Sequence, residues 1–322
     1  MKRLFINGHG WSGSSAFIEL MQSDDTLGLI PGEFDDFRVP GTMREILTGD
    51  VKKISNMRSH RVPSIFFVLR FLIRGIVPDL LWPSFIRGKS IKRSKSANLG
   101  AGYLAEWFLF KKTKFRLSKC AHSVSNNNKI NDILESWFDG ICTIYGKNKN
   151  IITIEQALLF DDDPSLYSWT KADKFIVFIR SPRKQLQSTK ESDVLYSNYP
   201  WQAQFLIGSN RSFEAQAHRL FIETSVRRYK WIESFFSDYE SNSVLFVDFD
   251  SFLYDFEETL FKIQKFVGED LNFNHDEFNI SDSQVRDLPY ETTDNSLEEL
   301  MSDAESSYDA FKANLKKLYA VI

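Results

Sequence analysis

A glycine- and serine-rich stretch close to the amino terminus, INGHGWSGSS (residues 6–15), nearly matches a phosphate-binding loop. The pattern G-x-x-x-x-G-K-[ST] is met by Gly8, Gly13 and Ser15, but Ser14 stands where the lysine is expected. In nucleotide triphosphatases that lysine neutralises charge on the β- and γ-phosphates. Backbone N–H groups and serine hydroxyls can bind an anion without it. The stretch therefore predicts a phosphate ligand other than the metal-bridged tail of ATP, or else a tight turn without chemistry.

A second stretch, IRSPRKQLQST (residues 179–189), carries Arg180 and Arg183 just after an apolar run. An arginine fork pairs well with a terminal phosphate. One cradle rich in backbone N–H groups and a second built on arginine would suit a nucleotide phosphorylated at both ends of its ribose. The alternative is that both arginines are ordinary solvated or ion-paired residues at the start of a helix.

These two stretches require strands that lead into them and helices that follow them. Proline at position 182 suits the first turn of a helix continuing through Gln187, and Gly268 suits a helix end. Strands that alternate with helices predict a parallel sheet covered on both faces. The expected strands are Arg3–Asn7, Leu27–Ile30, Ile151–Ile154, Lys174–Arg180 and Ser243–Asp250, and the further helices are Ser14–Gln22 and Phe256–Val267.

Three segments in this order, SGSS, IRSPRKQLQST and VLFVDFDSFLYDFEETLFKIQKFVG, together resemble sulfotransferases that use 3'-phosphoadenosine 5'-phosphosulfate (PAPS), and among them the carbohydrate sulfotransferases. The resemblance implies an α/β, three-layer P-loop NTPase-like fold with a central, mainly parallel sheet. It also implies a single domain over residues 1–322, with a basic and apolar helical insertion at about residues 51–146.

The resemblance implies where the co-substrate binds. The first motif would cradle the 5'-phosphosulfate, and Arg180 and Ser188 would hold the 3'-phosphate. PAPS would be the co-substrate and 3'-phosphoadenosine 5'-phosphate (PAP) the product, with no metal. The residues implicated at the first motif are Gly10, Trp11, Ser12, Gly13, Ser14 and Ser15.

Sulfuryl transfer also needs a base that collects the proton of the attacking hydroxyl. The segment LIPGEFDDFRVPG is similar to a run that supplies a glutamate base in heparan-type sulfotransferases, and Glu33 is the matching position. Asp36 and Arg38 would then contact the acceptor, and His9 is the reserve base. The alternative for Glu33 is a surface turn carboxylate.

Two positions depart from the family pattern. Gly32 replaces the lysine that precedes the glutamate, and Trp11 stands where Lys or Arg usually precedes the serine-rich motif. That cation would stabilise the leaving bridging oxygen. Either Arg38 or Arg180 takes its role, or activity is impaired.

Composition limits the location and the partners of the chain. The 322 residues carry a formal net charge of -3, which gives no overall attraction to nucleic acid. Two cysteines, Cys120 and Cys142, exclude a disulfide scaffold and a four-thiolate zinc site. The amino terminus has too short an apolar run for a signal peptide. We therefore expect a cytoplasmic protein.

One region is not explained by the nucleotide motifs. Residues 58–95 hold nine Arg and Lys residues, a single acid, Asp79, and an interleaved apolar run that is broken by prolines. The region either packs on the core as a helical insertion, or shapes the acceptor site and contacts an anionic membrane at its inner face. A lipid-linked glycan would suit the second interpretation.

The sequence thus predicts a transferase that moves a sulfuryl group from PAPS to a hydroxyl of a glycan or glycolipid, that is, carbohydrate sulfation. A P-loop kinase of a small molecule or sugar is the first alternative, but it would need the missing lysine and a magnesium-binding carboxylate. The second alternative is a non-catalytic nucleotide-binding protein, which Trp11 keeps open.

Overall fold

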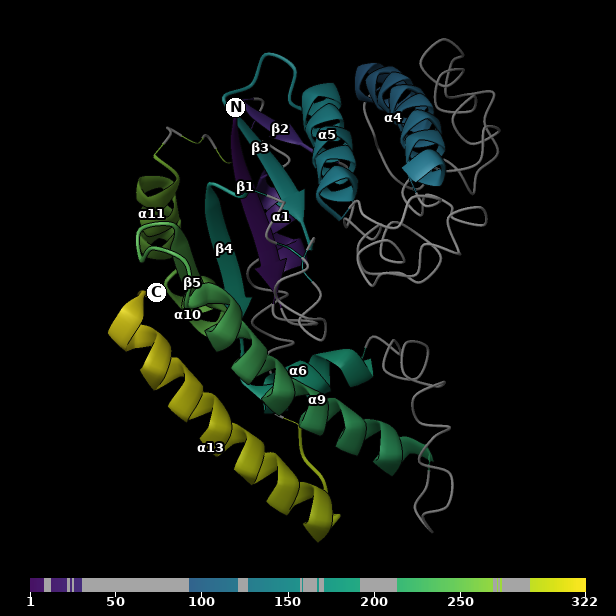
Figure 1. The fold of residues 1–322 in the computed structure, drawn as a ribbon. Coiled ribbons are helices and arrows are strands. Elements are labelled where there is room, and N and C mark those ends of the chain that lie inside the picture. Colours follow the sequence, from purple (N-terminus) through teal and green to yellow (C-terminus); the bar gives the residue numbers. More distant parts are fainter. Residues whose placement is uncertain are drawn as a thin grey trace. The chain divides into compact units, whose positions relative to one another are not determined.

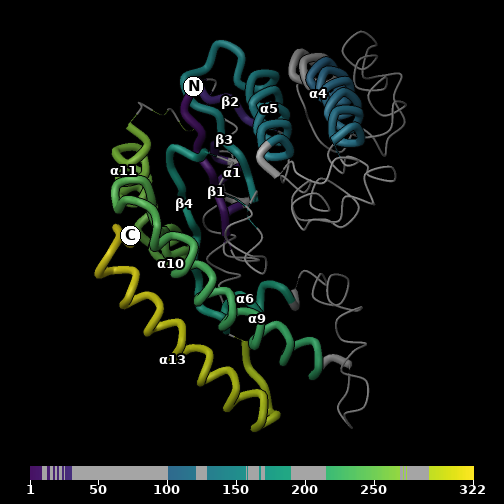
Figure 2. The backbone as a smooth tube through the Cα atoms, in the orientation of Figure 1, coloured from purple at the N-terminus to yellow at the C-terminus, as the bar shows by residue number. Residues whose placement is uncertain are grey.

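The computed structural model describes the chain in two compact units, which are considered separately. Figure 2 traces the backbone and draws in grey the residues whose placement is uncertain. The first unit comprises residues 1–3, 27–158 and 166–171, and the second comprises residues 4–26, 159–165 and 172–322. The described residues are 1–8, 13–21, 24, 26–30, 93–120, 127–156, 158, 167, 171–191, 213–268, 271, 273 and 290–322.

The second unit is built on a parallel sheet. Its strands are β1 (Lys2–Gly8), which begins in the first unit, β4 (Lys174–Ile179), β5 (Val244–Asp248) and β6 (Ala320–Val321), and they lie in that order. All three pairings are parallel, with Ile6 beside Ile176 and Ile176 beside Leu245. The parallel sheet expected from the sequence is confirmed, and the short strand β6 adds an edge that the sequence did not indicate.

Alternation along β4 places its aromatic side chains on opposite faces of this sheet. Phe178 packs against Phe17 of α1 (Ser14–Met21), with ring centroids 5.3 Å apart. Phe175 packs against Phe236 of α9 (Phe213–Phe236), at 5.1 Å. All four side chains are fully buried. Helices therefore cover both faces, and the predicted three-layer α/β fold is confirmed.

The local signals for helix ends act largely as expected. Helix α6 (Pro182–Glu191) begins at the proline, and α11 (Phe256–Val267) ends at Gly268 with a φ of 78°. The strand predicted to continue to Asp250 ends instead at Asp248. The Asp248 side chain accepts a hydrogen bond from the Asp250 backbone N–H, 3.0 Å, and so caps α10 (Phe249–Tyr254).

The longest helices of this unit lie side by side in Figure 1, α9 next to α13 (Asn295–Leu318). Helix α13 is capped by Asp294, whose carboxylate accepts from Ser296 N at 2.9 Å. Leu186 of α6, Phe221 of α9 and Met301 of α13 meet in one buried cluster. This apolar contact holds α6 against both long helices.

The first unit contains a strand pair and a helix pair. Strands β2 (Leu27–Leu29) and β3 (Ile151–Glu155) pair in parallel. Helices α4 (Arg93–Cys120) and α5 (Asn127–Tyr145) run antiparallel, because Tyr145 donates to Glu106 at 2.7 Å and Arg116 donates to Ser136 at 3.4 Å. Both helices fall within the insertion expected at residues 51–146. The single-domain organisation remains a prediction.

Among the described helices, none combines the length and the apolar composition that crossing a membrane requires. The basic and apolar stretch at residues 58–92 lies outside the described residues.

Candidate functional site

Strands β1, β4 and β5 of the second unit end side by side at one edge of the sheet. Gly8 ends β1 beside Phe178, and Ile179 of β4 lies beside Asp248, the last residue of β5. Helices α1, α6 and α10 begin within six residues of these ends. Helix N-termini carry unpaired N–H groups and a partial positive charge, so this edge is suited to an anion.

Gly13 occupies a position that only glycine can fill. Its φ is 95°, and its carbonyl accepts the first hydrogen bond of α1, from Phe17 N at 3.3 Å. A Cβ built on Gly13 would lie 2.0 Å from two ring carbons of Phe249. The glycine therefore permits both the left-handed turn into α1 and the close approach of the Phe249 ring. Ser14, the next residue, is buried.

Arg180 follows β4 directly, and only 4% of the residue is exposed. Its Nη1 donates to Ser188 Oγ across one face of α6, at 2.8 Å. The guanidinium carbon lies 4.9 Å from the centroid of the Phe249 ring. The Phe249 ring thus contacts the loop glycine and Arg180 together, which couples the ends of β1 and β4 through the first residue of α10.

Asp248 and α13 hold Phe249 in place. The Asp248 carboxylate caps α10 and forms an ion pair with Lys312 of α13. In the first turn of α10, Asp250 pairs with Lys184 of α6 at 3.0 Å. These contacts anchor the N-terminus of α10, whose first residue is Phe249, to α6 and α13.

Tyr308 of α13 adds a buried hydroxyl to this side of the sheet edge. Burial raises the pKa of Tyr308; the neighbouring Tyr229, Asp250 and Asp309 raise it further, and Arg180 opposes them. The hydroxyl therefore stays protonated at neutral pH and can donate a hydrogen bond.

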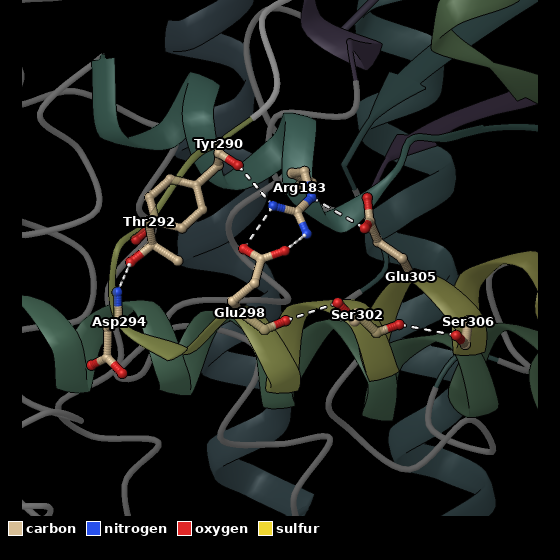
Figure 3. A network of polar contacts seen from close by, with 8 residues as sticks. All are labelled: Arg183, Tyr290, Thr292, Asp294, Glu298, Ser302, Glu305 and Ser306. Carbon is tan, nitrogen blue, oxygen red and sulfur yellow. Dashed lines mark hydrogen bonds and ion pairs between the residues drawn. The ribbon is translucent and has the colours of Figure 1, made fainter. Parts of the chain in front are cut away.

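Arg183 answers one question that the sequence left open. Its guanidinium donates to both oxygens of Glu298, at 3.0 and 2.6 Å, to Glu305 at 3.1 Å and to the Tyr290 carbonyl at 3.0 Å (Figure 3). The hydrogen bond with Glu298 is the main cause that raises the pKa of Arg183, against the opposing effect of burial. Arg183 is therefore a structural tie between α6 and α13, as the ion-pair interpretation predicted.

The other predicted site residues divide into two groups. Gly13, Ser14, Arg180 and Ser188 are described, and the structure brings Gly13 and the Arg180–Ser188 pair together around Phe249. For Ser15, the backbone belongs to α1. The remaining candidates lie outside the described residues: His9, Gly10, Trp11, Ser12, Glu33, Asp36 and Arg38.

Sequence reasoning missed Phe249, Asp248 and Lys312. The segment that contains Phe249 and Asp248 was singled out as a strand with a following helix, but nothing in it marked one aromatic ring as a contact of Gly13. Lys312 lies 64 residues from its partner in an ordinary amphipathic helix. No local signal could have paired it with Asp248.

Comparisons with known proteins find similarity in structure but not in sequence. No protein-family profile matches the chain, and no curated protein matches it. The sulfotransferase domain of the Synechococcus PCC 7002 olefin synthase aligns with a TM-score of 0.48 and 12% identity, over 96% of this chain and 94% of that domain. The sulfotransferase domain from the curacin biosynthetic pathway aligns with a TM-score of 0.46 and 11% identity, over 100% and 99%. Likenesses at this level leave the activity to be inferred from the residues.

Proposed function

We propose that the chain is a PAPS-dependent sulfotransferase that sulfates a hydroxyl of a glycan or glycolipid. The observation that carries the proposal is the Arg180–Ser188 hydrogen bond at the end of β4, coupled through Phe249 to Gly13. The pattern that implied a 3'-phosphate pair and the pattern that implied a 5'-phosphosulfate loop therefore belong to one edge of one sheet.

The residues present fit such a ligand. Arg180 Nη1 and Ser188 Oγ are 2.8 Å apart, so a single phosphate can reach a guanidinium and a hydroxyl together. Glycine at position 13 lets the backbone turn at the start of α1 with no side chain over the loop. Gly10, Ser12, Ser14 and Ser15 complete the donor set in the proposed loop, and Trp11 lies among them.

The proposed chemistry is a single in-line displacement. PAPS supplies the sulfuryl group, and PAP leaves as its product. The acceptor oxygen forms a bond to sulfur as the bond from sulfur to the bridging phosphate oxygen breaks, and Glu33 takes the acceptor proton, with His9 in reserve. Asp36 and Arg38 orient the acceptor. Arg38 stabilises the leaving oxygen in place of the cation that Trp11 replaces, because Arg180 is assigned to the 3'-phosphate.

Calorimetry with PAP in the presence of EDTA tests the nucleotide half of the proposal. We expect PAP to bind without a divalent metal and far more tightly than ATP, because Ser14 replaces the lysine that a triphosphate needs. Binding that requires magnesium, or a preference for ATP, would favour a kinase and contradict the sulfotransferase.

Transfer from radiolabelled PAPS to pools of glycans and glycolipids tests the second half. Glu33→Gln should lower turnover by roughly a hundredfold to ten-thousandfold while PAP affinity stays near normal, as expected of a general base. Full turnover in this variant, measured where chemistry limits the rate, would move the base to another residue. A chain that binds PAP but transfers nothing would be the non-catalytic nucleotide-binding protein that Trp11 leaves open.

A further inference from the structure

The outward side of α4 has a composition that its packing does not explain. The helix buries one stripe, Glu106, Phe110, Thr113, Leu117 and Cys120, spaced three or four residues apart. On the opposite side, Phe108 is 61% exposed and Phe115 is 60% exposed. These two side chains are seven residues apart, so they project from the same side of the helix, roughly 10 Å from each other.

Cations surround these two rings. Between Glu106 and Lys119 the sequence has five Lys and Arg residues and one acid. That acid, Glu106, is 1% exposed and accepts a hydrogen bond from Tyr145. Lys119 lies over the Phe115 ring at 4.3 Å, and Lys111 lies over the Trp107 ring at 5.5 Å. The exposed side of this part of α4 is therefore cationic and aromatic, without an exposed acid.

The carboxylates of the neighbouring helix α5 whose ion pairs are described have partners outside α4. On α5, Asp139 pairs with Arg3 and Glu135 pairs with Lys171. The pKa of Lys114 on α4 is lowered, first by burial and then by the charge of Lys111. The second cause is repulsion between two lysines of this helix.

From this juxtaposition we propose that the outward face of α4, defined by Phe108, Lys111, Lys112, Phe115 and Lys119, docks on an anionic lipid surface. The helix lies along the interface with the two phenylalanine rings among the acyl chains, and the lysine ammonium groups contact the lipid phosphates. The proposal does not rest on sulfuryl transfer. It also differs from the membrane contact predicted for residues 58–95, because it assigns the contact to α4.

Two other occupants fit the α4 face less well. A second copy of the chain docking through the same face would place its three lysines against three others and would be repelled. Single-stranded nucleic acid is usually held in a basic groove that tracks its backbone, whereas these rings protrude from the side of a helix. An anionic bilayer offers acyl chains to the exposed rings and phosphates to the cations.

Flotation of the full chain with vesicles tests the proposal. We expect binding at low salt to vesicles of three parts phosphatidylcholine to one part phosphatidylglycerol, little binding to phosphatidylcholine alone, and weakening as salt is raised. Lys111→Gln with Lys112→Gln and Lys119→Gln should weaken binding roughly a hundredfold, at about fivefold for each cation near the surface. Phe108→Ser with Phe115→Ser should weaken it at least tenfold, since two apolar insertions are lost.

Matched variants control for the general effects of charge and of exposed rings. Phe261 on α11 is 65% exposed and is followed by Lys262, so Phe261→Ser should leave binding unchanged. Lys316→Gln with Lys317→Gln, at the exposed last turn of α13, should do the same. Circular dichroism and unfolding curves confirm that each variant is folded.

Several results would overturn the proposal. One is the absence of flotation at low salt, and another is flotation that the α4 variants do not reduce. Loss of binding only when Arg70, Arg74, Arg87 and Lys89 are changed to glutamine would move the contact to residues 58–95. Equal loss on the control variants would indicate non-specific attraction. Retention on heparin that needs the lysines but not the phenylalanines, without flotation, would replace the membrane with a soluble polyanion.

Discussion

Arg180 and Arg183 are three residues apart at the carboxyl end of β4, yet the structure gives them different surroundings. Arg183 bridges two carboxylates of α13 and a backbone carbonyl, so its charge is neutralised by the protein (Figure 3). Arg180 contacts a serine hydroxyl and the face of an aromatic ring that also contacts the loop glycine. The difference shows that residue type alone does not decide the surroundings of an arginine, and it underlies the proposal that Arg180 binds a ligand while Arg183 ties two helices together.

The strongest test of this comparison is Arg180→Met against PAP. Loss of a charged hydrogen bond to phosphate should cost about 1.5–3 kcal/mol, or roughly 10- to 150-fold in affinity. Calorimetry with adenosine 5'-phosphate, which lacks the 3'-phosphate, should show a much smaller change. Arg183→Met is the matched control and should bind PAP nearly as the parent does. Equal losses for both nucleotides would remove Arg180 from the 3'-phosphate site.

Gly13→Ala tests whether the Arg180 region depends on close contact with the loop. The added Cβ would lie 2.0 Å from two carbons of the Phe249 ring, and the alanine would have to adopt a φ of 95°. We expect a loss of unfolding free energy of about 2–4 kcal/mol from overpacking and backbone strain, measured by urea unfolding.

The control for Gly13→Ala is Gly268→Ala, at the end of α11. Gly268 has a similar φ of 78°, but nothing lies within 4 Å of its added Cβ. Gly268→Ala should therefore lower the free energy of unfolding only through backbone strain, by about 1 kcal/mol. If the two variants were equally destabilised, the contact between Gly13 and Phe249 would have no energetic role.

Arg183→Met tests the structural side of the comparison. The variant removes a two-pronged ion pair with Glu298 and a bond to Glu305, but these carboxylates are 43% and 36% exposed, so water screens them. We expect the free energy of unfolding to fall by about 1–2 kcal/mol. Combined with the binding measurements, Arg183→Met should change stability more than PAP affinity, and Arg180→Met should do the reverse. The same ranking for both variants would contradict the division of roles.

The smallest expected effect is on pH dependence. Arg183 holds the pKa of Glu298 below its usual range. The main cause is the hydrogen bond that Arg183 donates, and attraction between the two charges adds to it. Since the folded pKa lies below the unfolded one, this contribution is present at neutral pH and is lost as pH falls through the folded pKa. The stability difference between the parent and Glu298→Gln should therefore shrink below about pH 4, near the usual glutamate pKa.

Urea unfolding at pH 7, 5 and 3.5 measures this dependence. Glu258, which pairs with Lys262 on the exposed side of α11, is the matched control. Glu258→Gln should show a weaker dependence because its partner is a single exposed lysine. A stability difference for Glu298→Gln that grows in acid would mean that the Arg183 network does not bind the carboxylate form.

The sequence predicted a substantial part of the fold. The buried runs of β1, β4 and β5 are apolar enough to be recognised alone, and Pro182 and Gly268 mark helix ends by their own backbone preferences. The end of β5 was misplaced by two residues, because the cap at Asp248 begins α10 while the apolar run continues. Such a cap depends on one hydrogen bond, from Asp250 N to the Asp248 carboxylate, that periodicity does not reveal.

The sequence by itself determined where the chain forms strands and helices and where the glycine- and arginine-bearing turns fall, because propensity, capping and periodicity act over a few neighbouring residues. Only the tertiary structure decided that Arg183 pairs with two carboxylates of α13. Glu298 and Glu305 are 115 and 122 residues from Arg183, and the ring that joins Gly13 to Arg180 comes from a third strand end. Contacts of this range are fixed by how the sheet and its helices pack, and packing is set by the whole core rather than by any one stretch.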